Sequence, residues 1–265
     1  MLVVQVFLWL IAYSFFGWAY ESALRSVTGR KSVNSGLLTG PICPIYGFGA
    51  LLVILALYRR TDNLLIIFFF SMILTCSVEY ITSLILEKLF HAKWWDYSHM
   101  RFNFQGRVSL IGAAAFGVLS VILIKYIHPF ISGRIRLLPQ AVQIFSASVL
   151  FAVLFIDTYL NVHSLLRLDG RLKEIHIAFN GFLEEYAKKS EGIKTALIEK
   201  SGEIKTALIV RFEESEFYSE RIKKLVLLNR VQMKRIARAF PKFKHINYDE
   251  AWQRLKSILL EVGKK

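Results

Sequence analysis

Residues 64–86 read LLIIFFFSMILTCSVEYITSLIL, and residues 87–107, which follow directly, read EKLFHAKWWDYSHMRFNFQGR. The first stretch is predominantly apolar and Glu79 is its only charged residue; a bilayer core needs about 20 mostly apolar residues per helix, so the stretch predicts a transmembrane helix. The second stretch gathers aromatic residues, amides, two histidines and opposite charges. A plain connector needs only a few turn residues, so we expect residues 87–107 to lie at a membrane surface and to bind or position something there.

The composition separates an apolar first part from a charged second part. The chain is 54% hydrophobic and has a mean hydropathy of +0.42, which is too apolar for an ordinary soluble domain. About 18 charged side chains fall within the first 160 residues, and about 36 fall in the remainder. We therefore predict an all-α fold, with a polytopic transmembrane domain over residues 1–163 and a basic helical cytoplasmic tail over residues 164–265.

Five apolar runs are candidates for membrane spans. They cover residues 2–20, 42–58, 64–86, 108–127 and 141–160. Gly106 and Pro129 are expected to bound the fourth run, and Pro139 precedes the fifth. The second run is short and rich in glycine, so a re-entrant segment is the alternative there.

Basic residues in the short loops predict the orientation. If the N-terminus is outside, the inner loops and the start of the tail hold about ten Lys and Arg residues, against about five in the outer loops. This excess favours an outer N-terminus and a cytoplasmic tail, and it places residues 34–47 and 87–107 on the cytoplasmic side. The net charge of +14 belongs mostly to the tail, and we expect it to attract anionic lipid rather than nucleic acid.

The tail shows helical periodicity from about residue 167 to residue 240. Within it, IKTALI at residues 193–198 recurs at residues 204–209, and a shift of eleven residues keeps the repeated apolar side chains on one helix face. Pro241 is expected to end this stretch. We interpret the tail helices as amphipathic elements that pack on their neighbours or on headgroups, with a protein-docking arm as the alternative.

A last helix is predicted after Pro241. Either Asn247 or Asp249 can cap its first turn. Its apolar stripe consists of Trp252, Leu255, Ile258, Leu259 and Val262.

Glu79 is the strongest single candidate for a functional residue. A carboxylate inside an apolar run costs several kcal/mol unless it is paired, protonated or faces a wet cavity. Ser83 and Glu87 follow four and eight residues later, so the three side chains share one helix face. This polar stripe predicts a substrate or ion path, or a partner for an arginine such as Arg107, and a clamp that holds helices together explains it equally well.

Two further segments on the expected cytoplasmic side contribute candidates. Glu21 follows the interfacial aromatics Trp18 and Tyr20, and it either adds polarity to the interface or faces the same cavity as Glu87. Residues 36–49 are rich in glycine and proline. Broken helices of this kind often expose backbone groups to ligands, but a tight loop that lets helices pack closely is slightly favoured.

Residues within 87–107 have alternative roles too. Trp94, Trp95 and Tyr97 are either interfacial aromatics or an aromatic wall for a ligand or a cation. Asp96 can pin the loop through an arginine, and Asn103 with Gly106 can form a turn. His91, Asp96 and His99 match no strong zinc signature, so no metal is expected.

Motifs for catalysis or nucleotide binding are absent from the sequence. Arg25 and Arg30 occupy positions where a phosphate-binding loop before Lys31 needs glycine, and neither GxSxG nor HExxH occurs. We therefore expect no enzyme activity and no cofactor. Cys43 and Cys76 lack metal-ligand spacing and are interpreted as small buried hydrophobes.

Several motifs together resemble a known family. They are FGWxxE at residues 16–21, NxGxLxGPxxPIYGxGA at 34–50, Glu79-Tyr80, Glu87, WWDYS at 94–98 and NxxGR at 103–107. This combination resembles the putative ABC-transporter type IV family of bacterial membrane proteins, which is common in Gram-positive bacteria. The resemblance covers about residues 5–130, and Arg101 departs from it. It implies a permease-like, multi-pass protein of the bacterial plasma membrane.

The leading hypothesis is therefore the membrane component of a transport system. It needs a separate ATPase subunit, and the expected partners are this subunit, membrane lipids and, as an option, a second copy of the chain, but no nucleic acid. The alternative is a non-transporting scaffold or regulator whose tail recruits a partner. An enzyme that acts on a lipid headgroup ranks last, because no nucleophile or metal is identifiable. The candidate polar substrate site, facing the cytoplasm, consists of Glu21, Asn34, Glu79, Glu87, Trp95, Asp96, Asn103 and Arg107.

Overall fold

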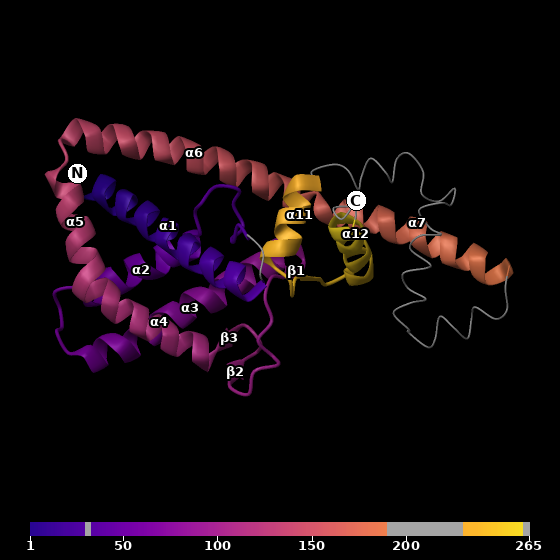
Figure 1. The fold of residues 1–265 in the computed structure, drawn as a ribbon, viewed down its shortest axis with the longest axis horizontal. Coiled ribbons are helices and arrows are strands. Elements are labelled where there is room, and N and C mark those ends of the chain that lie inside the picture. Colours follow the sequence, from indigo (N-terminus) through magenta and orange to yellow (C-terminus); the bar gives the residue numbers. More distant parts are fainter. Residues whose placement is uncertain (30–32, 190–229, 262–265) are drawn as a thin grey trace. The chain divides into compact units, whose positions relative to one another are not determined.

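The structure is a computed structural model that describes residues 1–29, 33–189 and 230–261 (Figure 1). The chain divides into two compact units. The first unit consists of residues 1–163 together with residues 238–243. The second contains the described parts of residues 164–237 and 244–265.

The first unit is built almost entirely from helices. Their bounds are α1 (Leu2–Gly29), α2 (Pro44–Leu57), α3 (Leu64–Phe90), α4 (Leu110–Ile122), the π-helix η1 (Leu123–Ile127), α5 (His128–Leu137) and α6 (Gln140–Leu166), whose last residues belong to the second unit. Three two-residue strands accompany them, namely β1 (Ala92–Lys93), β2 (Asn103–Phe104) and β3 (Val108–Ser109). Strands β2 and β3 form an antiparallel hairpin that pairs Asn103 with Ser109 and Phe104 with Val108.

Four helical stretches are long and apolar enough to cross a membrane. They are Leu2–Thr28, Leu64–Phe90, Leu110–Leu137 and Gln140–Phe182. Large apolar side chains on their outer faces, including Phe69 on α3 and Phe155 on α6, are exposed and therefore suit contact with lipid. The predicted mostly helical fold is confirmed, and the four long apolar helices agree with a multi-pass membrane protein. The second predicted run, residues 42–58, forms only the 14-residue α2, which is about 21 Å long against a hydrocarbon core of about 30 Å.

Residues 33–43 reach α2 without forming a helix, and they run back along α1. Backbone amides of this segment bond to successively earlier residues of α1, at distances of 3.0–3.1 Å. The pairs are Val33 with Ser26 Oγ, Ser35 with Ser22 Oγ, and Cys43 with the carbonyl oxygen of Ser14. The irregular segment is therefore bound to a helix along its length, which irregular backbone among membrane helices requires.

Asp157 on α6 satisfies two further backbone groups of this segment. Its two carboxylate oxygens accept hydrogen bonds from the amides of Thr39 (3.2 Å) and Gly40 (3.0 Å). Asn161, one turn later, donates to Asp157 Oδ1 at 2.7 Å and to Thr39 Oγ1 at 3.1 Å. Asp157 thus has specific partners that hold the broken segment against α6.

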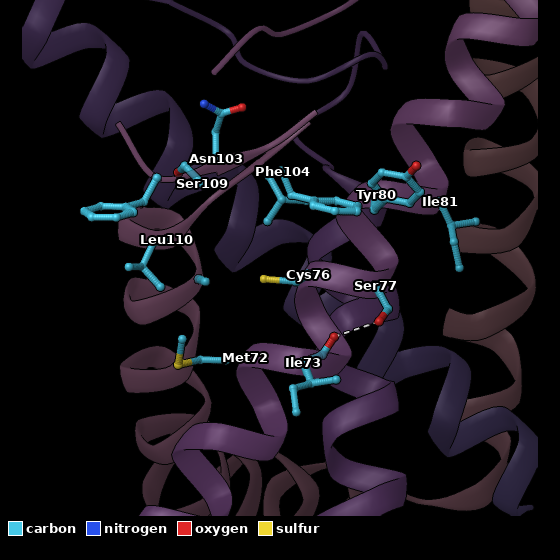
Figure 2. Close-up of a pocket in the computed structure, with 13 residues that line it drawn as sticks. Met72, Ile73, Cys76, Ser77, Tyr80, Ile81, Asn103, Phe104, Ser109 and Leu110 are labelled. Carbon is cyan, nitrogen blue, oxygen red and sulfur yellow. Dashed lines mark hydrogen bonds between the residues drawn. The ribbon is translucent and has the colours of Figure 1, made fainter. Parts of the chain in front are cut away.

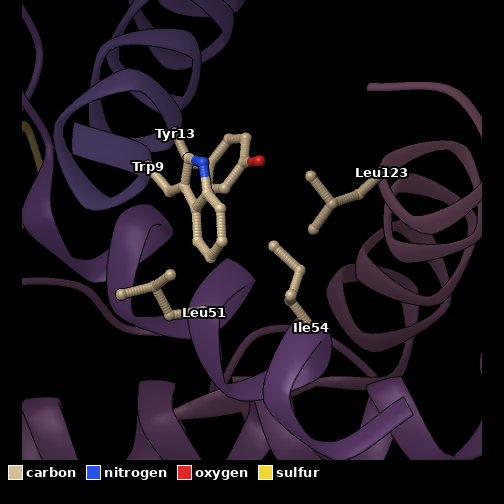
Figure 3. Packing of buried hydrophobic residues seen from close by; sticks show 5 residues of the cluster. All are labelled: Trp9, Tyr13, Leu51, Ile54 and Leu123. Atoms are coloured by element: carbon tan, nitrogen blue, oxygen red, sulfur yellow. The ribbon is translucent and has the colours of Figure 1, made fainter. Parts of the chain in front are cut away.

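Helices α1 and α2 approach so closely that two contact positions admit only glycine. A Cβ atom on Gly47 would lie 2.1 Å from Ser14 Oγ and 2.6 Å from the carbonyl oxygen of Leu10. On the other helix, a Cβ atom on Gly17 would lie 2.2 Å from Tyr46 Cβ. Elsewhere along the same helix pair, Trp9 and Tyr13 of α1 pack with Leu51 and Ile54 of α2 and with Leu123, as Figure 3 shows. The glycines therefore permit close helix packing, which was the favoured interpretation of this segment.

The fourth apolar run extends further than expected. Pro129 was predicted to bound it, but the helical path continues through η1 and α5 to Leu137. In η1 the amide of His128 bonds the carbonyl oxygen of Leu123, so the α-helical bonding pattern has already shifted where the proline enters. The donor that Pro129 lacks is therefore not needed there, and the chain bends instead of ending, as Figure 1 shows between α4 and α5.

The second unit packs helices around aromatic and aliphatic side chains. Its elements are α7 (Leu168–Lys189), α11 (Arg230–Ala239), whose last two residues belong to the first unit, β4 (Lys244–His245) and α12 (Asp249–Glu261). Helices α7 and α12 lie against each other, and the Arg254 guanidinium stacks 3.1 Å above the Phe179 ring. Burial lowers the pKa of Arg254 to about 10, partly offset by Glu250.

The helix ends and the apolar stripe predicted for the tail fall partly within this unit. Helix α11 ends two residues before Pro241, and α12 begins at Asp249. Trp252, Leu255 and Leu259 of the predicted stripe are buried. The eleven-residue repeat at residues 193–209, the side chain of Ile258 and all of Val262 lie outside the described part of the chain.

The Gly47→Ala substitution should destabilise the protein. Because the new methyl group would overlap a backbone carbonyl of α1, the helices must separate, at a cost of about 1–3 kcal/mol. Gly49→Ala is the matched control on the same helix, since its Cβ atom would lie 3.8 Å from Thr75. Thermal melting of the purified protein in detergent measures both, and equal melting temperatures for the two variants would contradict the close approach of α1 and α2.

Candidate functional site

A cavity of about 370 Å³ lies between α1, α2, α3 and α4, next to residues 95–97. One end is polar and is lined by Glu21, Arg25, Tyr46, Glu79 and Tyr97. The other end is apolar and is lined by side chains such as Phe116, Leu119 and Leu123. The four helices therefore border a cavity that has both charged and hydrocarbon surfaces.

Glu21 has two firm partners at the polar end. Arg25, one turn later on α1, donates from Nε to Glu21 Oε1 at 2.6 Å. The Tyr46 hydroxyl of α2 donates to Glu21 Oε2 at 2.5 Å. Tyr46 packs directly on Gly17, so the close approach of α1 and α2 sets the position of this carboxylate.

Glu79 projects from α3 and is only 8% exposed. The Tyr97 phenol interacts with its carboxyl group, and Glu21 is close enough to repel it. Within the described residues, no arginine, lysine or histidine forms an ion pair with Glu79. Burial, followed by the charges of Glu79 and Glu21, raises the pKa of Tyr97, which keeps the phenol protonated and able to donate.

Residues 238–243 close one side of the cavity. Phe240 lines it, Arg25 stacks 5.7 Å from the Phe240 ring centroid, and Arg25 Nη1 donates to the carbonyl oxygen of Ala239. The Trp94 ring meets the rings of Phe240 and Phe243 edge-on, at centroid distances of 4.9 and 5.1 Å. A segment far along the sequence thus becomes part of the site.

The structure brings three of the eight predicted site residues to this cavity. Glu21, Glu79 and Trp95 line it. The Trp95 indole donates from Nε1 to the carbonyl oxygen of Arg107 at 2.9 Å, which fixes the ring beside the cavity.

Glu87 and Arg107 form a separate pair that does not line the cavity. Arg107 Nη1 lies 2.8 Å from Glu87 Oε2 and donates to Ser83 Oγ at 2.9 Å. Ser83 and Glu87 both come from α3, so Arg107 ties the β2–β3 hairpin to that helix. The polar stripe predicted on α3 is therefore divided, with Ser83 and Glu87 in a clamp and Glu79 in the cavity.

Asn34, Asp96 and Asn103 shape loops and are not part of the cavity lining. Asn34 accepts from the Trp18 indole at 2.6 Å, and Asp96 accepts from the amide of Ser98 at 2.9 Å. Asn103 accepts from the amide of Gly106 at 2.8 Å, in a turn where Gly106 has a positive φ of 68°. Asn103 and Gly106 form the turn that was expected, and Arg107 pairs with Glu87.

The two histidines considered as metal ligands have different structural roles. His91 ends α3 in the left-handed conformation, with a φ of 49°. The ring of His99 accepts from Lys242 at 3.0 Å. Among the described residues, no group of three His, Cys, Asp or Glu side chains is arranged to hold a metal ion.

A second hollow, shown in Figure 2, lies between α3 and α4 beside the β2–β3 hairpin. It measures about 800 Å³ and is open and largely apolar. Ile73, Ile81, Phe104 and Leu110 border it and are more than half exposed. Because it faces outward from two apolar helices, it is a surface for lipid chains rather than an enclosed site.

Sequence reasoning missed several cavity residues. Arg25 had a readable signal, because it lies four residues after Glu21 and such pairs meet on a helix. Tyr46 was noticed only within a motif, whereas Tyr97 was considered as part of an aromatic wall but was not among the candidate site residues. Phe240 carried no signal at all, since a tail residue reaches the cavity only through the tertiary fold.

Comparison with sequence models of protein families identifies the family of the chain. The model described as Putative ABC-transporter type IV matches residues 8–162, which is more than half of the chain. The chain therefore belongs to the putative ABC-transporter type IV family. The match confirms the resemblance carried by the motifs and extends past residue 130, where that resemblance was expected to end. No curated protein and no solved structure matches the chain.

Arg107→Ala and Glu79→Gln should differ in their effect on stability. Arg107→Ala leaves a largely buried Glu87 carboxylate without its cation, at a cost of about 1–3 kcal/mol. Glu79→Gln keeps the shape of a side chain that has no basic partner among the described residues, and its amide oxygen can still accept from Tyr97, so it should cost less than Arg107→Ala. Thermal melting in detergent checks both. If Glu79→Gln melts as early as Arg107→Ala, Glu79 is a structural clamp.

Proposed function

We propose that the chain is the membrane component of a transport system of the bacterial plasma membrane, and that the cavity around Glu21 and Glu79 is its substrate site. The observation that supports this most is Glu79, a buried carboxylate that faces a cavity among apolar helices, because such groups usually mark substrate or ion pathways. Membership of the putative ABC-transporter type IV family agrees with it. Since the sequence holds no nucleotide-binding motif, a separate ATPase subunit supplies the energy.

The proposal includes five crossings of the membrane. Residues 33–57 make the second one as a broken span, an irregular segment along α1 followed by the short α2. Broken helices of this type surround substrate sites in many transporters. Five crossings place the termini of the membrane domain on opposite sides, and the excess of basic loop residues places the N-terminus outside and the tail in the cytoplasm.

Cysteine labelling in intact cells tests this topology. Ser98→Cys and Asp62→Cys, each in a chain whose native cysteines are replaced by serine, put a thiol on exposed residues at opposite ends of α3. A maleimide that cannot cross the membrane should label Asp62→Cys at once and Ser98→Cys only after permeabilisation. Labelling of Ser98→Cys from outside would reverse the orientation.

The contacts of residues 238–243 favour a second candidate, a membrane scaffold or regulator whose tail recruits a partner. The rings of Phe240 and Phe243 each meet the Trp94 ring edge-on, and Lys242 donates a hydrogen bond to His99. A tail that is tied to the cavity in this way is placed to report whether the cavity is occupied. In this second candidate the tail carries the function, and the cavity controls it.

Affinity purification of the full chain in mild detergent separates the two candidates. For a transport component, an ATPase should co-purify with the chain, and it should remain bound to the Glu79→Gln variant, because that substitution alters the cavity and not the surface. Absence of any ATPase would contradict the transport proposal. A different protein that co-purifies, and that is lost when the chain is truncated after residue 168, would identify a scaffold instead.

A further inference from the structure

The charge and the aromatic lining of the cavity identify a class of ligand. We propose that the cavity binds a small monovalent organic cation, such as a quaternary ammonium group, with Glu79 as its counter-ion. This inference rests on the proposed function, because it names the substrate class of the same site. Three properties support it, namely the charge balance, the nature of the walls and the size.

The first property is an excess of negative charge. Glu21 and Glu79 both line the cavity, and within the described part of the chain Arg25 is the only lysine or arginine that does so. Arg25 is already engaged by Glu21 at 2.6 Å and by the carbonyl oxygen of Ala239. The Tyr97 phenol stabilises the Glu79 carboxylate, whereas burial and repulsion from Glu21 disfavour it, and a cation in the cavity reduces both of these costs.

The second property is the aromatic character of the polar end. Tyr20, Tyr46, Trp95, Tyr97 and Phe240 contribute to the walls around the two carboxylates. Aromatic faces attract cations through their quadrupole, most strongly where water is excluded, and cages of such rings recognise quaternary ammonium groups. A neutral or anionic ligand gains nothing comparable from these walls.

The third property is the size and ligand set. A volume of about 370 Å³ is at the lower end of the range of about 300–1,000 Å³ that small-molecule pockets have. An organic cation fills this space with apolar groups that also suit Leu119 and Phe116. A bare metal ion does not, because most of the lining is carbon and the described residues contain no group of three metal-binding side chains.

Choline and 3,3-dimethyl-1-butanol test the inference as a matched pair. The two molecules share one shape, and only choline carries a charge. Isothermal titration of the unmodified, detergent-purified chain should show that choline binds at least about tenfold more tightly than the alcohol. Equal affinities, or binding of neither molecule, would overturn the proposal, and this comparison depends on no substitution.

Two variants assign the selectivity to Glu79. Glu79→Gln should abolish the preference for choline, whereas Asp62→Asn, which removes a fully exposed carboxylate just before the start of α3, should keep it. Melting temperatures of both variants verify that they are folded. A preference that survives Glu79→Gln would show that another group holds the cation and would overturn the assignment.

Failure of this inference and failure of the transport proposal give different results. If an ATPase co-purifies but choline binds no better than the alcohol, the substrate class is wrong and the transport component remains. If choline is preferred but no ATPase accompanies the chain, the cavity is a cation site and the transport proposal fails.

Discussion

The structure depends on one constraint, which is that the backbone groups of residues 33–43 must be bonded although they form no helix. These residues lie among helices that are long and apolar enough to cross a membrane, and an unsatisfied amide in such surroundings costs several kcal/mol. Serine side chains and a carbonyl group of α1 accept from one side of the segment, and Asp157 of α6 accepts from the amides of Thr39 and Gly40. The break in the second apolar run is therefore stable only because both neighbouring helices supply acceptors.

This break also determines where the cavity lies. Because the segment keeps α2 short and in register with the middle of α1, Gly47 faces Ser14 and Tyr46 faces Gly17. Tyr46 is then within hydrogen-bonding distance of Glu21, and the space beyond it becomes the cavity that Glu79 enters from α3. Close packing on one side of the helix pair and an open compartment on the other side thus have the same origin.

Three carboxylates near the same end of the helices have different roles because they have different partners. Glu87 is paired with Arg107, and Glu21 is paired with Arg25 and Tyr46, so both hold elements together. Glu79 has a phenol beside it and no cation among the described residues. Spacing alone could place Glu79, Ser83 and Glu87 on one face of α3, but it could not distinguish these roles, since the arginine that separates them comes from the hairpin.

The sequence by itself determined the helical membrane character of the first part, the family, the polar face of α3 and an interruption of helical structure within residues 36–49. These features depend on composition and on periodicity within one segment, which are local. Only the tertiary structure decided that Asp157 binds that segment, that Glu87 is clamped while Glu79 lines a cavity, and that Phe240 reaches the same cavity from the tail. Each of these depends on contacts between residues distant in sequence, and burial and partner choice arise only when separate helices pack together.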